Sequence, residues 1–465
     1  MLNKLWHTWV ERRIPRVFLA TMAAESSILS PLPEPSLPEV HSSVRVSRSP
    51  LYWRRLLGFL GPGFLISVGY MDPGNWATDI AGGSRFGYTL LFVIMASNLM
   101  AILLQSLSLK LGVATERDLA QMCNESYARW VSISLWIGAE IAIAACDLAE
   151  VIGSAIALNL LFHIPLFYGV LITGLDVLLI LLLQRWGFRY IEALVIALIG
   201  TIVVLFGVQV FLSRPEYWPV LRNLVVPSTA ILTNPAMLYI AIGMLGATVM
   251  PHNLYLHSSI VQSRKYKRTP EGKREAIHMA NVDSALALTL ALFVNAAILV
   301  VAAAVFNRSG HYEVAAIEDA YKLLSPLLGA AGASTIFAIA LLASGQNSSI
   351  TGTLAGQVVM EGFIHIHVAP WLRRLITRSL AIIPTIIVVW FTGERGTENL
   401  LLLSQVILSL QLSFAVVPLV VFTSSRKKMG EFVNAPWLKA LSWAVAALIA
   451  GLNAWFLVLM ATGKA

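Results

Sequence analysis

Two short polar motifs interrupt long apolar stretches of this chain, and both contain side chains that ligate metal ions. The first reads Asp-Pro-Gly-Asn at 72–75 and the second reads Met-Pro-His-Asn at 250–253. The proline of the first motif lacks a backbone donor and its glycine permits unusual dihedral angles, so a helix would open there and leave carbonyl groups unpaired. A cation can satisfy them together with the side-chain oxygens of Asp72 and Asn75. A polar helix cap without a ligand is the alternative.

A carboxylate at the centre of a membrane helix costs at least about 2.5 kcal/mol on insertion scales, so the presence of Asp72 in the first motif indicates a functional role.

The second motif adds a soft ligand. Met250 alone would be read as packing. Beside a second broken helix, its thioether is a donor that Mn²⁺, Fe²⁺, Co²⁺ and Cd²⁺ tolerate and that Mg²⁺ and Ca²⁺ use poorly.

A third apolar stretch contains the acids Glu140, Asp147 and Glu150. Steps of seven and three residues place them on one face of a helix. Acids in such a position are either a hydrogen-bonded structural seam or a titratable relay for protons. The residues alone leave both interpretations open.

Composition identifies the elements that must position these groups. The 465 residues are 57% hydrophobic and 12% charged, with a mean hydropathy of +0.74. An ordinary soluble domain is about one quarter charged, so an integral membrane protein is indicated. The net charge of +8 lies mostly in short loops between apolar spans, which argues against nucleic-acid binding. We expect Cys123 and Cys146 to be free thiols.

Eleven apolar segments are long enough to cross a bilayer. The two motifs interrupt the first and the sixth, which predicts an all-α protein built as a five-plus-five inverted repeat with broken helices 1 and 6. The spans are expected near 57–84, 89–112, 131–160, 166–184, 190–212, 236–262, 279–306, 334–360, 375–392, 398–423 and 437–460.

The distribution of basic residues predicts the orientation. Most Lys and Arg residues fall on one side when the N-terminus is placed in the cytoplasm, which puts the C-terminus outside. No signal peptide is apparent. We expect residues 1–54 to be a cytoplasmic, largely disordered tail and residues 55–462 to be the transporter domain, embedded in the inner (plasma) membrane as a multi-pass protein.

The two motifs, extended to 72–79 and 247–257, resemble the signature sequences of the Nramp family of proton-coupled divalent-metal transporters. Similarity continues through 146–154, 262–264 and 404–411. The resemblance covers about residues 55–460 and implies a LeuT-type fold. It also implies metal ligation at matching positions, namely the side chains of Asp72, Asn75 and Met250, the carbonyl of Ala247 and, in some conformations, Gln411. Gln405 lies two turns from Gln411, which leaves the tenth-span ligand open, and Ser413 departs from an expected proline.

The resemblance further implies a proton pathway. Asp147 and Glu150 match its acids, and His252 matches a histidine beside the metal site. His257 is about 140° away from His252 around a regular helix, so the two are not expected to serve one site, and His257 is left as either a structural residue or one that lines the inner cavity. Apart from the resemblance, Arg264 is placed at the cytoplasmic end of the sixth span, where it can pair with an acid and close the inward vestibule, and Arg374 and Arg378 are candidate partners for Asp147 or Glu150. Ordinary positive-inside flanking charge is the alternative for all three arginines, and it is favoured for Arg374. The full predicted pathway comprises Asp72, Glu140, Asp147, Glu150, His252, Arg264 and Arg378.

The sequence thus predicts a non-enzymatic, proton-coupled importer of divalent metals, Mn²⁺ first and then Fe²⁺, Co²⁺ and Cd²⁺. No cofactor, nucleic acid or obligate protein partner is expected; the partners are metal ions, protons and the lipid bilayer. A sodium-coupled symporter of organic solutes on the same fold is the main alternative, and Met250 argues against it. An intramembrane metalloenzyme would need a His-Glu-x-x-His pattern, which does not occur. A metal sensor is not excluded by sequence.

Overall fold

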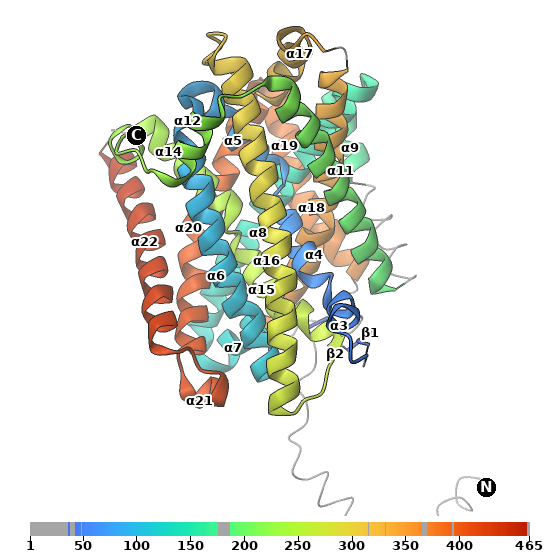
Figure 1. Ribbon diagram of the computed structural model, residues 1–465, viewed down its shortest axis with the longest axis vertical. Coiled ribbons are helices and arrows are strands. Elements are labelled where there is room, and N and C mark those ends of the chain that lie inside the picture. The colour runs from blue at the N-terminus through green and yellow to red at the C-terminus, as the bar shows by residue number, and fades with distance from the viewer. Residues whose placement is uncertain are drawn as a thin grey trace, which may run out of the picture. The chain divides into compact units, whose positions relative to one another are not determined.

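A computed structural model describes residues 36–37, 42–47, 49–174, 187–314, 316–330, 332–364, 370–392 and 395–462. This part of the chain is almost entirely helical (Figure 1). Within these residues the strands are limited to β1 (Val44–Arg45) and β2 (Arg264–Lys265), which pair in parallel.

The first half contains the expected broken helix. It consists of α4 (Pro62–Gly69) and α5 (Pro73–Phe86), separated by residues 70–72. Asp72 caps α5 by accepting a hydrogen bond from the backbone N–H of Asn75 at 2.8 Å. The other elements of this half are α3 (Tyr52–Phe59), α6 (Leu91–Thr115), α7 (Leu119–Ser126), α8 (Arg129–Phe162), α9 (Leu166–Thr173), α11 (Phe188–Ser213), α12 (Tyr217–Val225) and α13 (Ala230–Thr233).

The second half repeats this break. Helix α14 (Pro235–Thr248) ends just before Val249, and α15 (Pro251–Ile260) begins with a proline after Met250. Proline at the first helical position suits a new helix because its missing N–H would have no partner there. The remaining helices are α16 (Pro270–Ala302), α17 (Ile317–Leu328), α18 (Ala333–Ile364), α19 (Pro370–Thr392), α20 (Arg395–Thr423), α21 (Arg426–Met429) and α22 (Pro436–Ala461).

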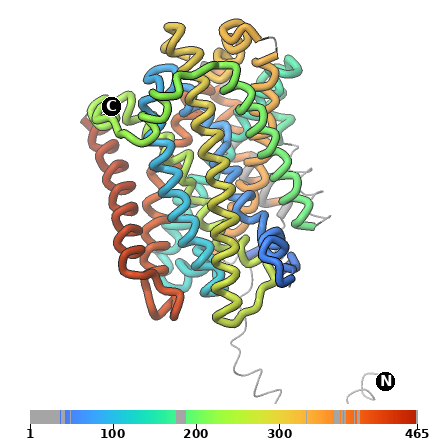
Figure 2. The backbone as a smooth tube through the Cα atoms, in the orientation of Figure 1, coloured from blue at the N-terminus to red at the C-terminus, as the bar shows by residue number. Residues whose placement is uncertain are grey.

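The sixth predicted span lies at the centre of the bundle. In the described residues, seven helical runs are long and apolar enough to cross a membrane, and the count of eleven stays a prediction. The most apolar stretch of the run Pro235–Ser263 is 94% buried by protein, against 28% for Pro436–Ala461. Figure 2 shows the last helix, in red, at the edge of the bundle, while the long helix α16 passes in front of the broken helices.

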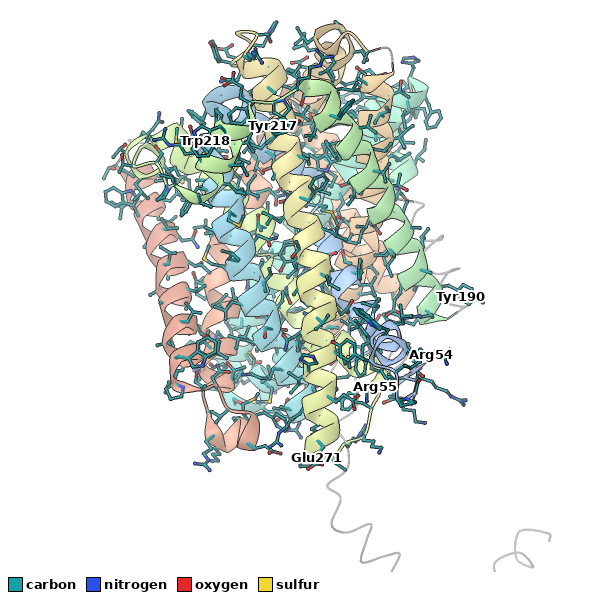
Figure 3. All side chains as sticks on the ribbon, viewed as in Figure 1. Arg54, Arg55, Tyr190, Tyr217, Trp218 and Glu271 are labelled. Atoms are coloured by element: carbon teal, nitrogen blue, oxygen red, sulfur yellow. The ribbon has the colours of Figure 1, made fainter. Side chains whose placement is uncertain are left out.

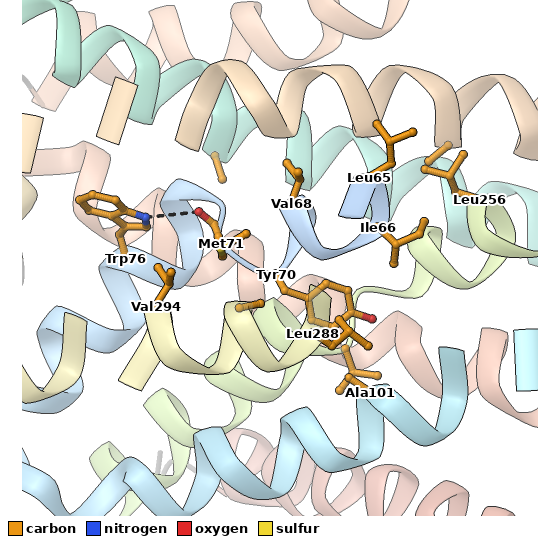
Figure 4. Packing of buried hydrophobic residues seen from close by; sticks show 14 of the residues in the cluster. Leu65, Ile66, Val68, Tyr70, Met71, Trp76, Ala101, Leu256, Leu288 and Val294 are labelled. Atoms are coloured by element: carbon orange, nitrogen blue, oxygen red, sulfur yellow. Dashed lines mark hydrogen bonds between the residues drawn. The ribbon is translucent and has the colours of Figure 1, made fainter. Parts of the chain in front are cut away.

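Aromatic packing holds the first break in place. Trp76 is buried on α5, and its ring contacts Phe206 and Phe337 edge-on at centroid distances of 4.9 and 5.1 Å. Its indole N–H donates to the carbonyl of Met71 at 3.3 Å, as Figure 4 shows. The unwound stretch is therefore fixed against α11 and α18.

The two ends of the bundle differ in their surface residues. Figure 3 shows Arg54, Arg55 and Glu271 at one end and the aromatic pair Tyr217 and Trp218 toward the other. Both aromatic side chains are largely exposed, as is usual for residues at a membrane–water boundary. We call the end that carries Arg54 and Arg55 the basic end.

Candidate metal-binding site and proton route

The two broken helices meet at a buried cluster of oxygen and sulfur ligands. The side-chain amide of Asn75 donates to the carboxylate of Asp72 at 2.7 Å, and to the carbonyl of Ala247 at 3.2 Å. Met250 lies against the end of α4, because a Cβ placed on Gly69 would lie 3.1 Å from its sulfur. The structure therefore brings together the four predicted ligands from the two breaks.

The electrostatics of this cluster favour a cation. The carbonyls of Gly69 and Ala247 lie at the C-terminal ends of α4 and α14, where the helix dipole is negative. Among the described residues, Oδ2 of Asp72 is buried without a hydrogen-bond partner. The Asp72 carboxylate, the Ala247 carbonyl and the Met250 thioether form a donor set that suits a moderately soft divalent ion, and rotation of the Asn75 amide, whose Nδ2 faces them here, would add its oxygen.

Among the described residues, no three His, Cys, Asp or Glu side chains lie together in a way that could hold a metal ion. The predicted ligand set differs from such a cluster, since only Asp72 belongs to those four residue types.

The tenth-span glutamines lie in different places. A Cβ on Gly74 would overlap the side-chain amide of Gln405, so Gln405 packs directly on the Asp72–Asn75 motif. Its Oε1 is buried and has no hydrogen-bond partner among the described residues. Gln411 packs instead on Gly138 of α8, where an added Cβ would lie 3.7 Å from its Nε2. The geometry favours Gln405 over the predicted Gln411 as a neighbour of the metal ligands.

Two of the predicted proton-pathway acids converge on helix α18. A Cβ on Gly352 would lie 3.0 Å from Oδ1 of Asp147 and 3.1 Å from Oε1 of Glu150. The thiol of Cys146 lies 3.7 Å from Glu150 and packs in the same apolar cluster as Met250, which links these acids to the metal ligands. Glu140 is half-buried and accepts a hydrogen bond from the indole of Trp136 at 3.0 Å.

The histidines of α15 have different surroundings. His252 is buried, and neither ring nitrogen has a hydrogen-bond partner in the described residues. His257 contacts Gln105 at 2.8 Å, and Gln105 donates to the hydroxyl of Tyr70 at 2.7 Å. Tyr70 lies in the first break, so His257 is joined to the metal ligands by a polar chain that sequence reasoning missed.

Asn295 on α16 completes this polar chain. It donates to the carbonyl of Tyr70 at 2.8 Å and to Oδ1 of Asn75 at 3.3 Å. Gln105 and Asn295 are amide residues within apolar spans, and that signal was present in the sequence. Their partners lie between 35 and 225 residues away, so the connection itself was not visible in the sequence.

Arg264 has the buried acidic partner that the sequence predicted in general terms. Its guanidinium lies 2.8 Å from Glu192 of α11, and both side chains are at most 1% exposed. It also donates to the carbonyl of Leu60 at 2.8 Å, just before α4. Asp283 accepts backbone hydrogen bonds from Gly61 and Gly63 at 3.2 and 2.7 Å. These groups fix the start of α4.

The side chains of Arg374 and Arg378, for which the sequence predicted roles, lie outside the part of the chain that the structure describes. Both positions lie on α19, whose backbone is described. Their role remains a prediction.

An apolar helical bundle with two helices broken at its centre, and predicted metal ligands at both breaks, defines a membrane transporter of the LeuT type. The chain belongs to the Nramp family: residues 63–459 match the family described as natural resistance-associated macrophage protein-like. The family and fold expected from the sequence are confirmed, and the family is one of transporters rather than enzymes.

Two similar proteins are divalent metal cation transporters. The chain is 63% identical over 424 residues to the divalent metal cation transporter MntH of Nostoc sp., covering 91% of this chain and 96% of that protein. The MntH of Listeria innocua is 60% identical over 423 residues, with coverage of 91% and 94%.

Solved structures agree with the fold. The Eremococcus coleocola manganese transporter is 44% identical and superposes with a TM-score of 0.84, covering 90% of each chain. The nucleobase-cation symporter Mhp1 in a closed conformation superposes with a TM-score of 0.60 at 14% identity, covering 93% of this chain and 94% of its own. The second similarity extends to the fold alone.

Proposed function

We propose that this protein is a symporter that imports divalent transition-metal ions together with protons by alternating access. Mn²⁺ is the principal substrate, and Fe²⁺, Co²⁺ and Cd²⁺ are accepted. The observation that carries the proposal is the bridge of Asn75 between Asp72 and the carbonyl of Ala247, with Met250 alongside. The manganese and divalent-metal transporters among the similar proteins support it.

Each ligand has a distinct task. Asp72 supplies the negative charge, Asn75 and Ala247 supply neutral oxygens, and the Met250 sulfur disfavours hard ions such as Ca²⁺. Gln405 is the tenth-helix residue placed to add a further oxygen, because it packs on Gly74. Gln411 would require movement of α20 to serve this purpose.

The proton enters near Asp72 and leaves the metal site along α8. It passes to Asp147 and Glu150, whose carboxylate oxygens both lie against Gly352 of α18. His252 lies next to the second break and assists this transfer, Glu140 extends the route along α8, and Arg264 and Arg378 balance its charge. Inward movement of each positive charge gains about 2.3 kcal/mol per 100 mV when the interior is negative, so import is favoured.

The protein resides in the plasma membrane with its N-terminus in the cytoplasm and its C-terminus outside. It needs no cofactor, because binding and translocation of the ion require only the ligands of the protein. Metal ions, protons and the bilayer are its partners, with no role for nucleic acid or an obligate protein partner.

Flux of Mn²⁺ into proteoliposomes, with internal pH recorded, tests the proposal. We expect uptake to acidify the lumen and to accelerate when the outside is made acidic. Uptake that depends on Na⁺ and not on pH would favour the sodium-coupled alternative. Binding without uptake would indicate a sensor.

A further inference from the structure

A segment that precedes the first helix packs across the basic end of the bundle. We call residues 36–37 and 42–47 the strap. Leu37 is only 1% exposed and belongs to the main apolar core. The hydroxyl of Ser36 donates to Asp118, a buried residue that caps α7. A short polar segment before a membrane domain has no general reason to bury a leucine so completely.

The strap is joined by backbone hydrogen bonds to the chain that leaves the second broken helix. The N–H of Ser42 donates to the carbonyl of Gln262 at 3.0 Å. Val44 and Arg45 then pair in parallel with Arg264 and Lys265. The strap thus adds a strand to the residues directly after α15.

The paired residue Arg264 also holds the first broken helix. Its backbone is in the two-stranded ladder, while its buried side chain binds Glu192 and the carbonyl of Leu60 before α4. Val46 continues the contact, since a Cβ on Gly58 of α3 would lie 3.3 Å from its side chain. The strap therefore touches both α3, which leads into α4, and the segment that restrains α4.

Under the proposed alternating-access function, we expect opening of the site toward the basic end to part α4 from α11 and from the chain after α15. This movement would break the contact between Arg264 and Leu60 and displace the strand that pairs with the strap. It would also disturb Val46 on α3. The strap is bonded to the elements that must separate, so its binding energy favours the state in which they are together.

We propose that the strap is a built-in latch that holds the cytoplasmic side of the transporter closed and must release before metal can leave. This inference rests on the proposed alternating-access function. It predicts that weakening the strap increases the fraction of molecules open to the cytoplasm without altering the metal ligands.

Cys123 provides a native reporter of that opening. It is a free, buried thiol on α7, one turn from the strap contact at Asp118. Burial raises the pKa of its thiol, which keeps it unreactive in the closed state. Labelling by a membrane-impermeant maleimide can be measured on purified protein in nanodiscs, with Cys123→Ser identifying the labelled site.

Two matched pairs of variants isolate the strap. Deletion of residues 2–47 removes it, whereas deletion of residues 2–35 keeps it. Leu37→Asp places a charge at a buried strap position, whereas Ser47→Asp places one at an exposed strap position. Because labelling through transient opening follows the population of the open form, we expect about tenfold faster labelling of Cys123 in the first member of each pair. Gel filtration and the melting temperature establish that each variant is folded.

Equal labelling rates within both pairs of folded variants would overturn the latch. If the longer deletion fails to fold, the Leu37→Asp and Ser47→Asp pair decides alone. Labelling is measured without Mn²⁺ flux. Absence of Mn²⁺ transport by the full-length protein would therefore challenge the proposed function and leave the labelling contrast intact.

Discussion

The side-chain amide of Asn75 lies 3.2 Å from the carbonyl oxygen of Ala247, across 172 residues of sequence. Asn75 lies in the first turn of α5, the second segment of one broken helix, and Ala247 lies in the last turn of α14, the first segment of the other. The two halves of the chain therefore share one ligand cluster. Any movement of one break relative to the other must alter the distances within that cluster, so the proposed metal binding would be coupled to conformation.

Replacement of Asp72 by Ala should abolish metal uptake. It removes the single carboxylate of the ligand cluster, and loss of even an outer-shell partner of a metal typically costs about 10- to 100-fold. We expect Mn²⁺ uptake in proteoliposomes to fall by more than about 100-fold. Asp319→Asn, at an exposed position on α17, is the control. Normal uptake by Asp72→Ala would refute the site.

Replacement of Met250 by Ala should weaken discrimination against Ca²⁺ more than it weakens Mn²⁺ uptake. Water can take the place of the sulfur, and hard ions accept that ligand. We expect Ca²⁺ to inhibit Mn²⁺ uptake at about tenfold lower concentration, which corresponds to about 1.4 kcal/mol. Met244→Ala removes a buried methionine from the same broken helix in a separate apolar cluster. Equal Ca²⁺ inhibition of both variants would exclude a thioether filter.

Paired alanine variants distinguish the two tenth-helix glutamines. Gln405 packs on the metal-binding motif and Gln411 packs on α8. We expect Gln405→Ala to raise the KM for Mn²⁺ by about tenfold, as loss of an auxiliary metal contact does. Gln411→Ala should leave KM nearly unchanged. The reverse order would restore the ligand that the sequence suggested.

The buried ion pair between Arg264 and Glu192 should be costly to break. Glu192→Leu leaves a buried guanidinium without its acid, for which about 3–5 kcal/mol of stability is typically lost. The double variant Glu192→Leu with Arg264→Met should recover much of this loss. The melting temperature in nanodiscs measures both effects.

The half-exposed pair of Arg55 and Glu275, with side chains 34% and 44% exposed, is the matched control. Its disruption should change stability by less than about 1 kcal/mol. If Glu192→Leu were as stable as Arg55→Ala, the prediction would be wrong. The backbone carbonyls that Arg264 contacts would then be sufficient to stabilise its buried charge.

Asp118 should make stability depend on pH. Burial raises the pKa of its carboxyl to about 6 from 3.8, although hydrogen bonds from Ser36 and the Gln121 N–H oppose the shift. The folded state therefore binds this proton more tightly than the unfolded state. Its ionisation destabilises the fold above about pH 6, and the penalty is relieved as pH falls toward 4.

We expect the melting temperature of the natural protein to rise relative to that of Asp118→Asn as pH is lowered from neutral toward 4. Glu271 should show the opposite sign, because hydrogen bonds to its own backbone and to Thr269 lower its pKa. Its contribution is present above its unfolded pKa and is lost in acid. A melting-temperature difference between the natural protein and Asp118→Asn that is independent of pH would contradict the assignment.

The sequence by itself determined the membrane class, the two breaks and the residue types at the metal site. Local chemistry decides these features. Proline and glycine disrupt a helix through their own backbone properties, and a carboxylate in an apolar span is energetically costly, which indicates a functional role. It could not choose between Gln405 and Gln411, which lie on the same helix and differ in what faces them.

Only the tertiary structure decided the partners. Glu192 as the acid of Arg264, the chain from His257 through Gln105 to Tyr70, and the placement of Leu37 in the core all join segments far apart in sequence. Helical periodicity gives the face of each side chain but not the neighbour that face meets. That neighbour depends on how the helices pack, which is set by the whole bundle.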